Sequence, residues 1–87
     1  MKKIYIITVV SLEADGCLSF DTLKYDTYNE AKSYGDKLLD EWVSEHCNEN
    51  ENGELTGVDI ERGTYFADAM STCTIAEFDY NITVFEV

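Results

Sequence analysis

The hydrophobic pattern of this chain changes its period twice, and this change constrains the fold more than any other feature. Residues 3–10 and 17–25 alternate with the two-residue period of β-strands. From Tyr28 to about Cys47, apolar side chains recur every three to four residues, as on one side of an α-helix. Alternation returns beyond residue 57. The pattern therefore predicts two strands, one helix and then further strands.

Turn and capping residues lie at the borders of these segments. Glu13-Ala14-Asp15-Gly16 separates the first two strands and predicts a β-hairpin. Thr27 and Glu30 fit the capping box that begins a helix. Residues 48–54 are polar and contain the turn pair Asn52-Gly53, which predicts a loop after the helix.

The C-terminal part predicts strands over 58–61 and 64–69, with a turn or bulge at Arg62-Gly63. Residues 71–87 fit either one long strand or a hairpin that turns near Asp79-Tyr80-Asn81. Residues 3–10 are apolar on both alternating faces, which is typical of a central strand.

Together these elements predict an α+β fold over a single domain, residues 1–87. We expect an antiparallel sheet of four to five strands, in the order β-β-α-β-β(-β), with one amphipathic helix packed on one face. The helix should contribute Tyr34, Leu38 and Trp42 to the core. Gly35 lies on the apolar side of the helix, where it would let the helix approach the sheet closely.

The chain is strongly acidic, with 18 Asp and Glu against 6 Lys and Arg and a formal charge of −12. This balance argues against direct binding to nucleic acid or to an anionic membrane. A hydrophobic content of 45% is too high for a disordered acidic tail. The short apolar run after Lys2 and Lys3 resembles a strand more than a signal peptide. Three widely spaced cysteines indicate reduced thiols, and so a cytoplasmic protein.

No catalytic or cofactor motif is present, so the sequence predicts a protein that is not an enzyme and needs no cofactor. His46 and Cys47 are adjacent, and adjacent helical side chains point about 100° apart, which prevents a Cys-His dyad. The paired spacing of zinc ligands is absent. Cys17 and Cys73 are expected to be small buried residues.

Residues 48–59, Asn-Glu-Asn-Glu-Asn-Gly-Glu-Leu-Thr-Gly-Val-Asp, partly match a calcium-binding EF-hand loop. Asn48, Asn50 and Asn52 stand at the first ligand positions, and Asp59 stands at the last. Asn48 is neutral where the motif has Asp, and a strand is expected to follow instead of a helix. The segment is therefore predicted to be a turn, with calcium binding kept as an alternative.

Acidic residues dominate the second half of the helix, the loop after it and the next strand. Like charges four residues apart destabilise a helix, so this concentration has a cost. A field of this sign attracts basic partners, such as the groove of a nucleic-acid-binding protein. The predicted partner-binding residues are Asp36, Asp40, Glu41, Glu45, Glu49, Glu51, Glu54, Asp59 and Glu61.

Three segments give the chain a likeness in style to known proteins. The chain begins Lys-Ile-Tyr-Ile-Ile-Thr-Val-Val from residue 3, enters its helix with Thr-Tyr-Asn-Glu-Ala-Lys, and ends Ile-Thr-Val-Phe-Glu-Val. In these features it resembles the small acidic proteins of phages and mobile elements, among them anti-CRISPR and anti-restriction proteins. The resemblance implies mimicry of nucleic acid and assigns no functional residues.

The sequence therefore predicts a non-enzymatic interaction protein whose acidic surface occupies the basic groove of a nucleic-acid-binding protein. Two alternatives remain. One is a calcium-responsive module built on residues 48–59. The other is a self-associating domain, a homodimer in which the last strand, Ile82 to Val87, pairs across a two-fold axis. In either alternative the acidic residues would form only a solvated face.

Overall fold

The computed structural model describes residues 2–49 and 51–87, apart from the side chains of Glu49 and Leu55. One helix and seven strands follow one another along this part of the chain. In order they are β1 (Lys3–Leu12), β2 (Leu18–Tyr25), α1 (Tyr28–His46), β3 (Asn48–Glu49), β4 (Leu55–Thr56), β5 (Val58–Arg62), β6 (Phe66–Ser71) and β7 (Glu77–Glu86).

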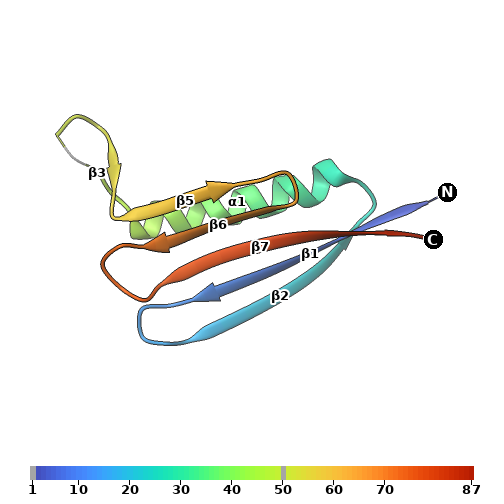
Figure 1. Cartoon of the computed structure of the whole chain (residues 1–87), viewed down its shortest axis with the longest axis horizontal. Helices are drawn as coiled ribbons and strands as arrows, with labels where there is room; N and C mark the ends of the chain where they lie inside the picture. Colours follow the sequence, from blue (N-terminus) through green and yellow to red (C-terminus); the bar gives the residue numbers. More distant parts are fainter. Residues whose placement is uncertain (1, 50) are drawn as a thin grey trace.

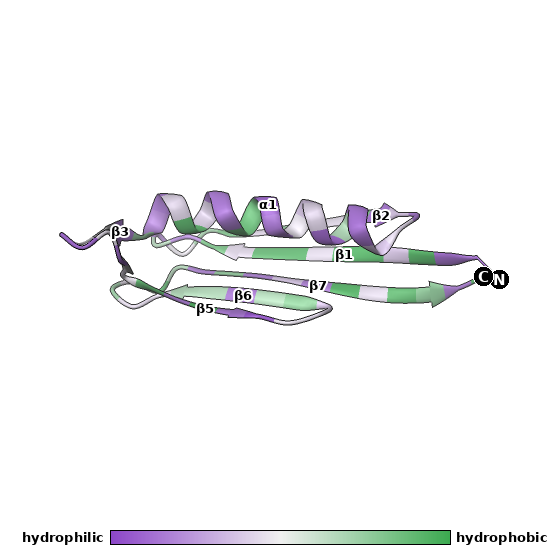
Figure 2. Ribbon diagram, turned by 90° about the horizontal axis from the view of Figure 1, so that it is seen from above, coloured by the Kyte–Doolittle hydropathy of each residue, from purple (hydrophilic) through white to green (hydrophobic). Residues whose placement is uncertain are grey.

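Five of the strands form one antiparallel sheet in the order β2-β1-β7-β6-β5, and the short strands β3 and β4 form a separate hairpin (Figure 1). Helix α1 packs along one face of the large sheet and contacts β1, β2, β6 and β7. Figure 2 shows the helix on that one side only, with β1 hydrophobic over much of its length. The predicted α+β architecture is confirmed, and β1 is a central strand as expected.

The first hairpin forms where the turn residues predict it. Strands β1 and β2 pair over eight residues, from Tyr5 opposite Tyr25 to Leu12 opposite Leu18. Gly16 has a φ of 91°, a conformation that favours glycine. The Asp15 carboxylate accepts a hydrogen bond from the backbone N–H of Cys17 at 2.9 Å, which lowers the pKa of Asp15.

The helix begins with the predicted capping box. The hydroxyl of Thr27 accepts a hydrogen bond from the backbone N–H of Glu30 at 3.2 Å and donates one to its carboxylate at 2.9 Å. At the other end, the backbone N–H of Cys47 donates to the carbonyl of Val43 at 2.8 Å. Local sequence therefore sets both ends of the helix within a residue of the prediction.

The core lies between α1 and the covered face of the sheet. The buried apolar residues are Ile7, Val9, Ala31, Leu39, Trp42, Val43, Ala67, Ala69, Ala76, Phe78, Tyr80 and Ile82. Trp42 is part of this core as predicted, while Tyr34 and Leu38 pack against it half-buried. A Cβ at Gly35 would lie 2.8 Å from Ile7 Cδ1 and from Tyr80 Cε2, so only glycine permits this helix–sheet distance.

The described residues 71–87 have no hairpin turn near Asp79-Tyr80-Asn81, which was one of the two predictions for the C-terminal segment. Strand β7 runs through these positions. Tyr80 is buried on the covered face, which continues the alternation of buried and exposed side chains along the strand. The turn lies earlier, where the N–H of Ser71 donates to the carbonyl of Ala76 at 2.9 Å.

The expectation of buried cysteines is wrong for both residues concerned. Cys17 and Cys73 are exposed, because each lies in a turn between strands and not at an inward strand position. No helix in the described part of the chain is long and apolar enough to cross a membrane.

The second face of the sheet carries no helix, and we call it the open face. Successive side chains of a strand point to opposite faces of the sheet. The strand register therefore shows which side chains point toward α1 and which lie on the open face. Its members from β2 and β1 are mostly apolar, and those from β7, β6 and β5 are mostly acidic or polar. They are Leu18, Phe20, Thr22, Lys24, Ile4, Ile6, Thr8, Val10, Leu12, Glu77, Asp79, Asn81, Thr83, Phe85, Phe66, Asp68, Met70, Asp59 and Glu61.

Candidate partner-binding site

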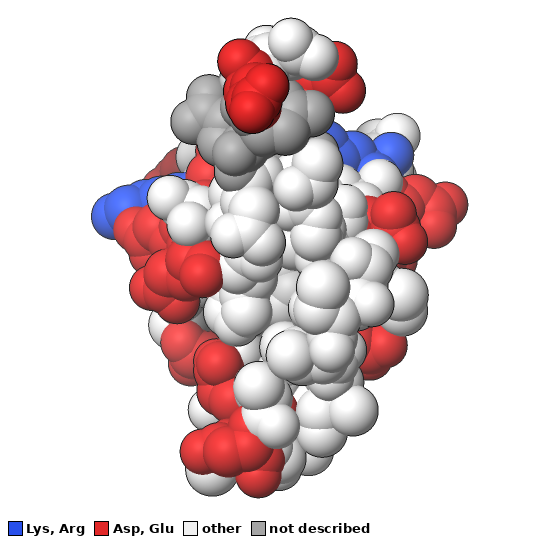
Figure 3. Space-filling model, turned by 90° about the vertical axis from the view of Figure 1, so that its left-hand side faces the viewer, with Lys and Arg blue, Asp and Glu red and all other residues white. Residues whose placement is uncertain are grey.

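The structure divides the predicted acidic residues among several places instead of joining them in one surface. Asp36, Asp40, Glu41 and Glu45 lie on α1, while Asp59 and Glu61 lie on the open face of the sheet. Figure 3 views the molecule from the end where the loops gather, and acidic side chains flank it on both sides with uncharged residues between them. The predicted acidic residues that the structure describes therefore do not form one continuous surface.

Asp36 and Asp40 belong to a network that ties the helix to the sheet. Arg62 on β5 approaches both carboxylates, with its Nη1 3.7 Å from Asp36 Oδ1 and its Nη2 3.1 Å from Asp40 Oδ1. Lys32 lies 3.6 Å from Asp36 Oδ1 on the helix itself. Arg62 thus pairs with carboxylates of this same chain.

The buried Tyr80 extends this network into the core. Its hydroxyl donates a 2.6 Å hydrogen bond to Asp36 Oδ1 and accepts one of 2.6 Å from Lys32 Nζ. Lys32 also donates to the carbonyl of Gly63 at 3.0 Å. Burial, and then the hydrogen bond to Asp36, raise the pKa of Tyr80 far above its usual value. The positive charges of Lys32 and Arg62 thus compensate the negative charges of Asp36 and Asp40, which weakens the negative potential that these two carboxylates produce at the surface.

The other predicted residues on the helix and in the β3–β4 hairpin form smaller groups. Glu41 and Glu45 are exposed on α1. Glu51 and Glu54 are exposed in the turn between β3 and β4, where Glu54 makes an interaction within the chain. The side chain of Glu49 lies outside the described residues.

The open face holds a group of acidic residues that the sequence analysis only partly anticipated. In the pairing register, Glu61 on β5 lies opposite Asp68 on β6, and Asp68 lies opposite Asp79 on β7. Neighbouring strands are about 4.8 Å apart, so three carboxylates stand side by side in one row across the sheet. We call Glu61, Asp68 and Asp79 the carboxylate row. Among the described residues, no lysine, arginine or histidine forms an ion pair with any of the three.

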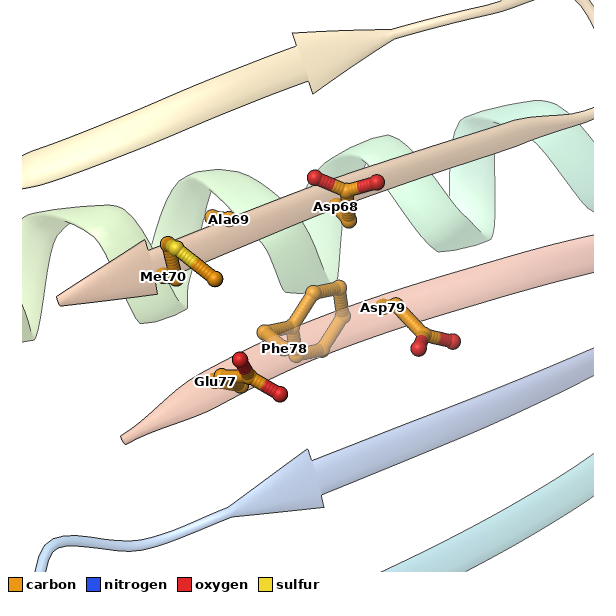
Figure 4. Close-up of a pocket in the computed structure, with 6 residues that line it drawn as sticks. All are labelled: Asp68, Ala69, Met70, Glu77, Phe78 and Asp79. Atoms are coloured by element: carbon orange, nitrogen blue, oxygen red, sulfur yellow. The ribbon is translucent and has the colours of Figure 1, made fainter. Parts of the chain in front are cut away.

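A cavity of about 220 Å³ lies beside two members of this row, Asp68 and Asp79. Its walls include Asp68, Met70, Glu77 and Asp79, and Figure 4 shows these side chains projecting from β6 and β7. Burial raises the pKa of Asp79, and the carboxylates of Asp68 and Glu77 raise it further. Desolvation and like-charge repulsion therefore both oppose ionisation of the Asp79 carboxyl.

The carboxylate row continues directly into apolar residues. Asp79 lies opposite Val10 on β1, and Val10 lies opposite Phe20 on β2. Val10 is half-buried, whereas the side chain of Phe20 is 68% exposed. The open face therefore offers negative charge and apolar surface side by side, which suits a partner with both basic and apolar side chains.

The segment of the proposed calcium loop adopts a different geometry. Asn48 pairs with Thr56 in the β3–β4 hairpin, and Asp59 lies beyond it in β5 on the open face. Asn50, a proposed ligand, lies outside the described residues. Among those that are described, no three metal-ligating side chains come together. This geometry gives the calcium alternative no support.

The single histidine takes part in packing. The ring of His46 stacks on Trp42 with a centroid distance of 4.1 Å, and Nδ1 lies 2.8 Å from the carbonyl oxygen of Trp42. Its Nε2 lies 3.7 Å from Glu13 Oε2. The Nδ1 contact stays within the helix, whereas the Nε2 contact joins the end of the helix to Glu13 at the β1–β2 turn.

Sequence reasoning missed Asp68, Glu77 and Asp79 because it followed the local density of acidic residues between 36 and 61. The available signal was their alternation with buried residues, since Ala67, Ala69, Phe78 and Tyr80 point to the covered face. These acidic residues lie near Glu61 only because β5, β6 and β7 pair with one another, and the hydrophobic periodicity of the sequence does not reveal which strands pair. Comparison with family models, curated protein sequences and solved structures found no match, so the function must be inferred from this chain's own geometry.

Proposed function

We propose that this protein is a non-enzymatic interaction protein that binds a basic surface of another protein through the open face of its sheet. The observation that carries the proposal is the carboxylate row, in which Glu61, Asp68 and Asp79 stand side by side without a cation among the described residues. Like charges directly opposite one another destabilise a sheet. The row therefore costs the fold stability, and binding a cationic partner would offset that cost.

A nucleic-acid-binding groove is the basic surface that fits this arrangement best. Neighbouring carboxylates about 5 Å apart form a line of negative charge of similar density to a nucleic-acid strand, which carries one phosphate per roughly 3.4 Å of helix axis. The apolar residues next to the row, Val10 and Phe20, would add contacts that phosphates do not provide. Mimicry of nucleic acid at such a groove is the mechanism we propose.

The proposal is tested by capturing proteins from a cell lysate with the wild type and two variants as baits. Glu61→Gln, Asp68→Asn and Asp79→Asn together remove the row without changing side-chain size. Glu41→Gln and Glu45→Gln remove two exposed charges on the helix and serve as the control. We expect wild-type and control baits to retain the same nucleic-acid-binding protein, and the row variant to lose it.

Competition separates mimicry from general charge attraction. A DNA or RNA oligonucleotide should displace the captured protein, and binding should weaken steeply with salt because exposed charges are screened over about 8 Å at physiological ionic strength. Equal loss of capture by both variants would contradict the assignment to the open face. Failure of the oligonucleotide to compete would contradict mimicry.

A further inference from the structure

The second unusual region is β2, which forms one edge of the sheet and is exposed along nearly its whole length. The strand pairs with β1 on one side, and the other side has no partner among the described residues. Seven of its eight residues are exposed, and Phe20 and Leu18 are the most exposed of its large apolar side chains. An edge of this length with apolar side chains is a ready template for pairing with another strand.

The hydrogen-bond pattern identifies the residues of β2 whose backbone N–H and C=O groups point away from β1. The N–H of Glu13 donates to the carbonyl of Cys17 at 2.8 Å, which makes these two a hydrogen-bonded pair. Pairs alternate in an antiparallel ladder, so the odd-numbered residues of β2 bond to β1. The even-numbered residues, Leu18, Phe20, Thr22 and Lys24, therefore direct their backbone N–H and C=O groups away from the sheet.

Charge determines which partner fits the edge. Two copies of a chain with a net charge of −12 repel one another over most of their surface. Strand β2 is an exception, because over residues 18–25 Asp21 is balanced by Lys24. The opposite edge, β5, is shorter and carries Asp59 and Glu61 against Arg62. The part of β7 that pairs only with β1, residues 83–86, is shorter still.

We propose that β2 is a homodimerisation edge, at which two copies of this chain pair their β2 strands antiparallel across a two-fold axis. Thr22 would lie at the axis opposite its own counterpart, and Phe20 would lie opposite Lys24 of the second copy. This register keeps Asp21 away from the second Asp21, which it would meet if the axis passed one residue earlier. The resulting ten-stranded sheet would bring the two Phe20 side chains onto one side of the sheet.

This inference differs from pairing through the last strand, because β7 lies between β1 and β6 over its first half. It is also independent of the proposed function, since it concerns the purified chain alone. In the dimer, both open faces would lie on the same side of the sheet. The two carboxylate rows would then flank a central apolar strip.

The first test is the mass of the purified chain by sedimentation equilibrium over a wide range of concentrations. We expect the mass to rise with concentration from 9.9 kDa toward twice that value. Phe20→Lys removes the most exposed apolar side chain of the edge, and Thr22→Pro removes an outward backbone N–H that β1 does not use. Both variants should stay at the monomer mass while keeping the circular dichroism of the folded protein.

Ile75→Lys is the matched control, because Ile75 is 61% exposed but lies in the turn before β7. It should dimerise like the wild type. A wild-type mass that stays at 9.9 kDa throughout would overturn the inference. So would dimerisation that survives both Phe20→Lys and Thr22→Pro.

Disulfide trapping tests the register. In a background with Cys17→Ser and Cys73→Ser, Thr22→Cys places two thiols at the axis, where paired Cα atoms about 5.5 Å apart are within disulfide reach. Phe20→Cys places them about 13 Å apart, four residues out of register. We expect mild oxidation to cross-link the first variant and leave the second uncross-linked. The opposite result would overturn the proposed pairing.

Discussion

Asp36 and Asp79 are both acidic residues close to the core, but the sheet gives them opposite electrostatic settings. Asp36 accepts a hydrogen bond from Tyr80 and lies near two cations, Lys32 and Arg62. Asp79 lies on the other face, where its nearest charged neighbours include Asp68 and no cation of the described residues forms an ion pair with it. Asp36 is compensated by cations of this chain, whereas Asp79 forms no ion pair with any cation of the described residues.

This difference shows why acidic density along the sequence is a poor guide to where uncompensated negative charge gathers in the fold. Asp36 and Asp40 stand in the most acidic segment, yet they serve to attach α1 to β5. Asp68 and Asp79 are far from each other in the sequence, yet the sheet brings them together. If the distinction is correct, neutralising residues of the two groups should change stability in opposite directions.

The largest effect should follow from removing the hydroxyl at the centre of the compensated group. Tyr80→Phe deletes a hydrogen bond to a carboxylate and one from an ammonium group, both in a part-buried setting. Hydrogen bonds to charged groups contribute about 1.5–3 kcal/mol, so we expect a loss of this order in the free energy of unfolding. For a domain of this size Tm falls by roughly 4–8 °C per kcal/mol, and calorimetry measures it.

Tyr65→Phe is the control for this variant. The ring of Tyr65 is 49% exposed, and its edge contact with Tyr28 survives loss of the hydroxyl. Its stability should stay within about 0.5 kcal/mol of wild type. Equal losses for the two tyrosines would mean that the Asp36–Tyr80–Lys32 network contributes nothing particular to the fold.

Asp36→Asn should have the second largest effect. The amide oxygen can still accept the hydrogen bond from Tyr80, but the attraction to Lys32 and Arg62 is lost. We expect a destabilisation of about 1–2 kcal/mol in urea unfolding at neutral pH. Asp40→Asn should cost less than about 1 kcal/mol, because the Asp40 side chain is 68% exposed and has a single cationic partner. A larger loss at Asp40 would contradict the network as described.

The fold was predictable because its signals are local. The period change near Tyr28, the capping pair Thr27 and Glu30, and the turn at Asp15-Gly16 each act over a few residues and agree with one another. The turn between β6 and β7 was missed, because residues 72–76 lack the glycine or proline that usually marks one.

The candidate site was less predictable because it depends on pairing between distant strands. Glu61, Asp68 and Asp79 become neighbours only through the register of β5, β6 and β7. The same holds for Arg62, whose partners lie on a helix more than twenty residues earlier. If one of these strands shifted its register by one residue, its carboxylates would move to the other face of the sheet. The amino-acid composition does not specify the register.

Asp79→Asn should have the smallest effect and the opposite sign. It removes a like-charge contact with Asp68, directly opposite on β6. Cross-strand pairs contribute roughly 0.2–1 kcal/mol, so the variant should be more stable than wild type by this amount at neutral pH. Urea unfolding measures the difference. Asp59→Asn, whose cross-strand neighbour is Met70, should be close to neutral.

The dependence of this gain on pH tests its cause. Burial and neighbouring carboxylates raise the pKa of Asp79 in the folded state, so the folded protein keeps this proton to a higher pH than the unfolded chain does. The contribution of Asp79 to wild-type stability therefore falls as the pH rises from the unfolded pKa, about 3.9, through the raised folded value. The advantage of Asp79→Asn should be absent below that window and complete above it. An advantage that is the same at low and neutral pH would mean that the asparagine stabilises the sheet by packing, and the contrast between Asp36 and Asp79 would then not be electrostatic.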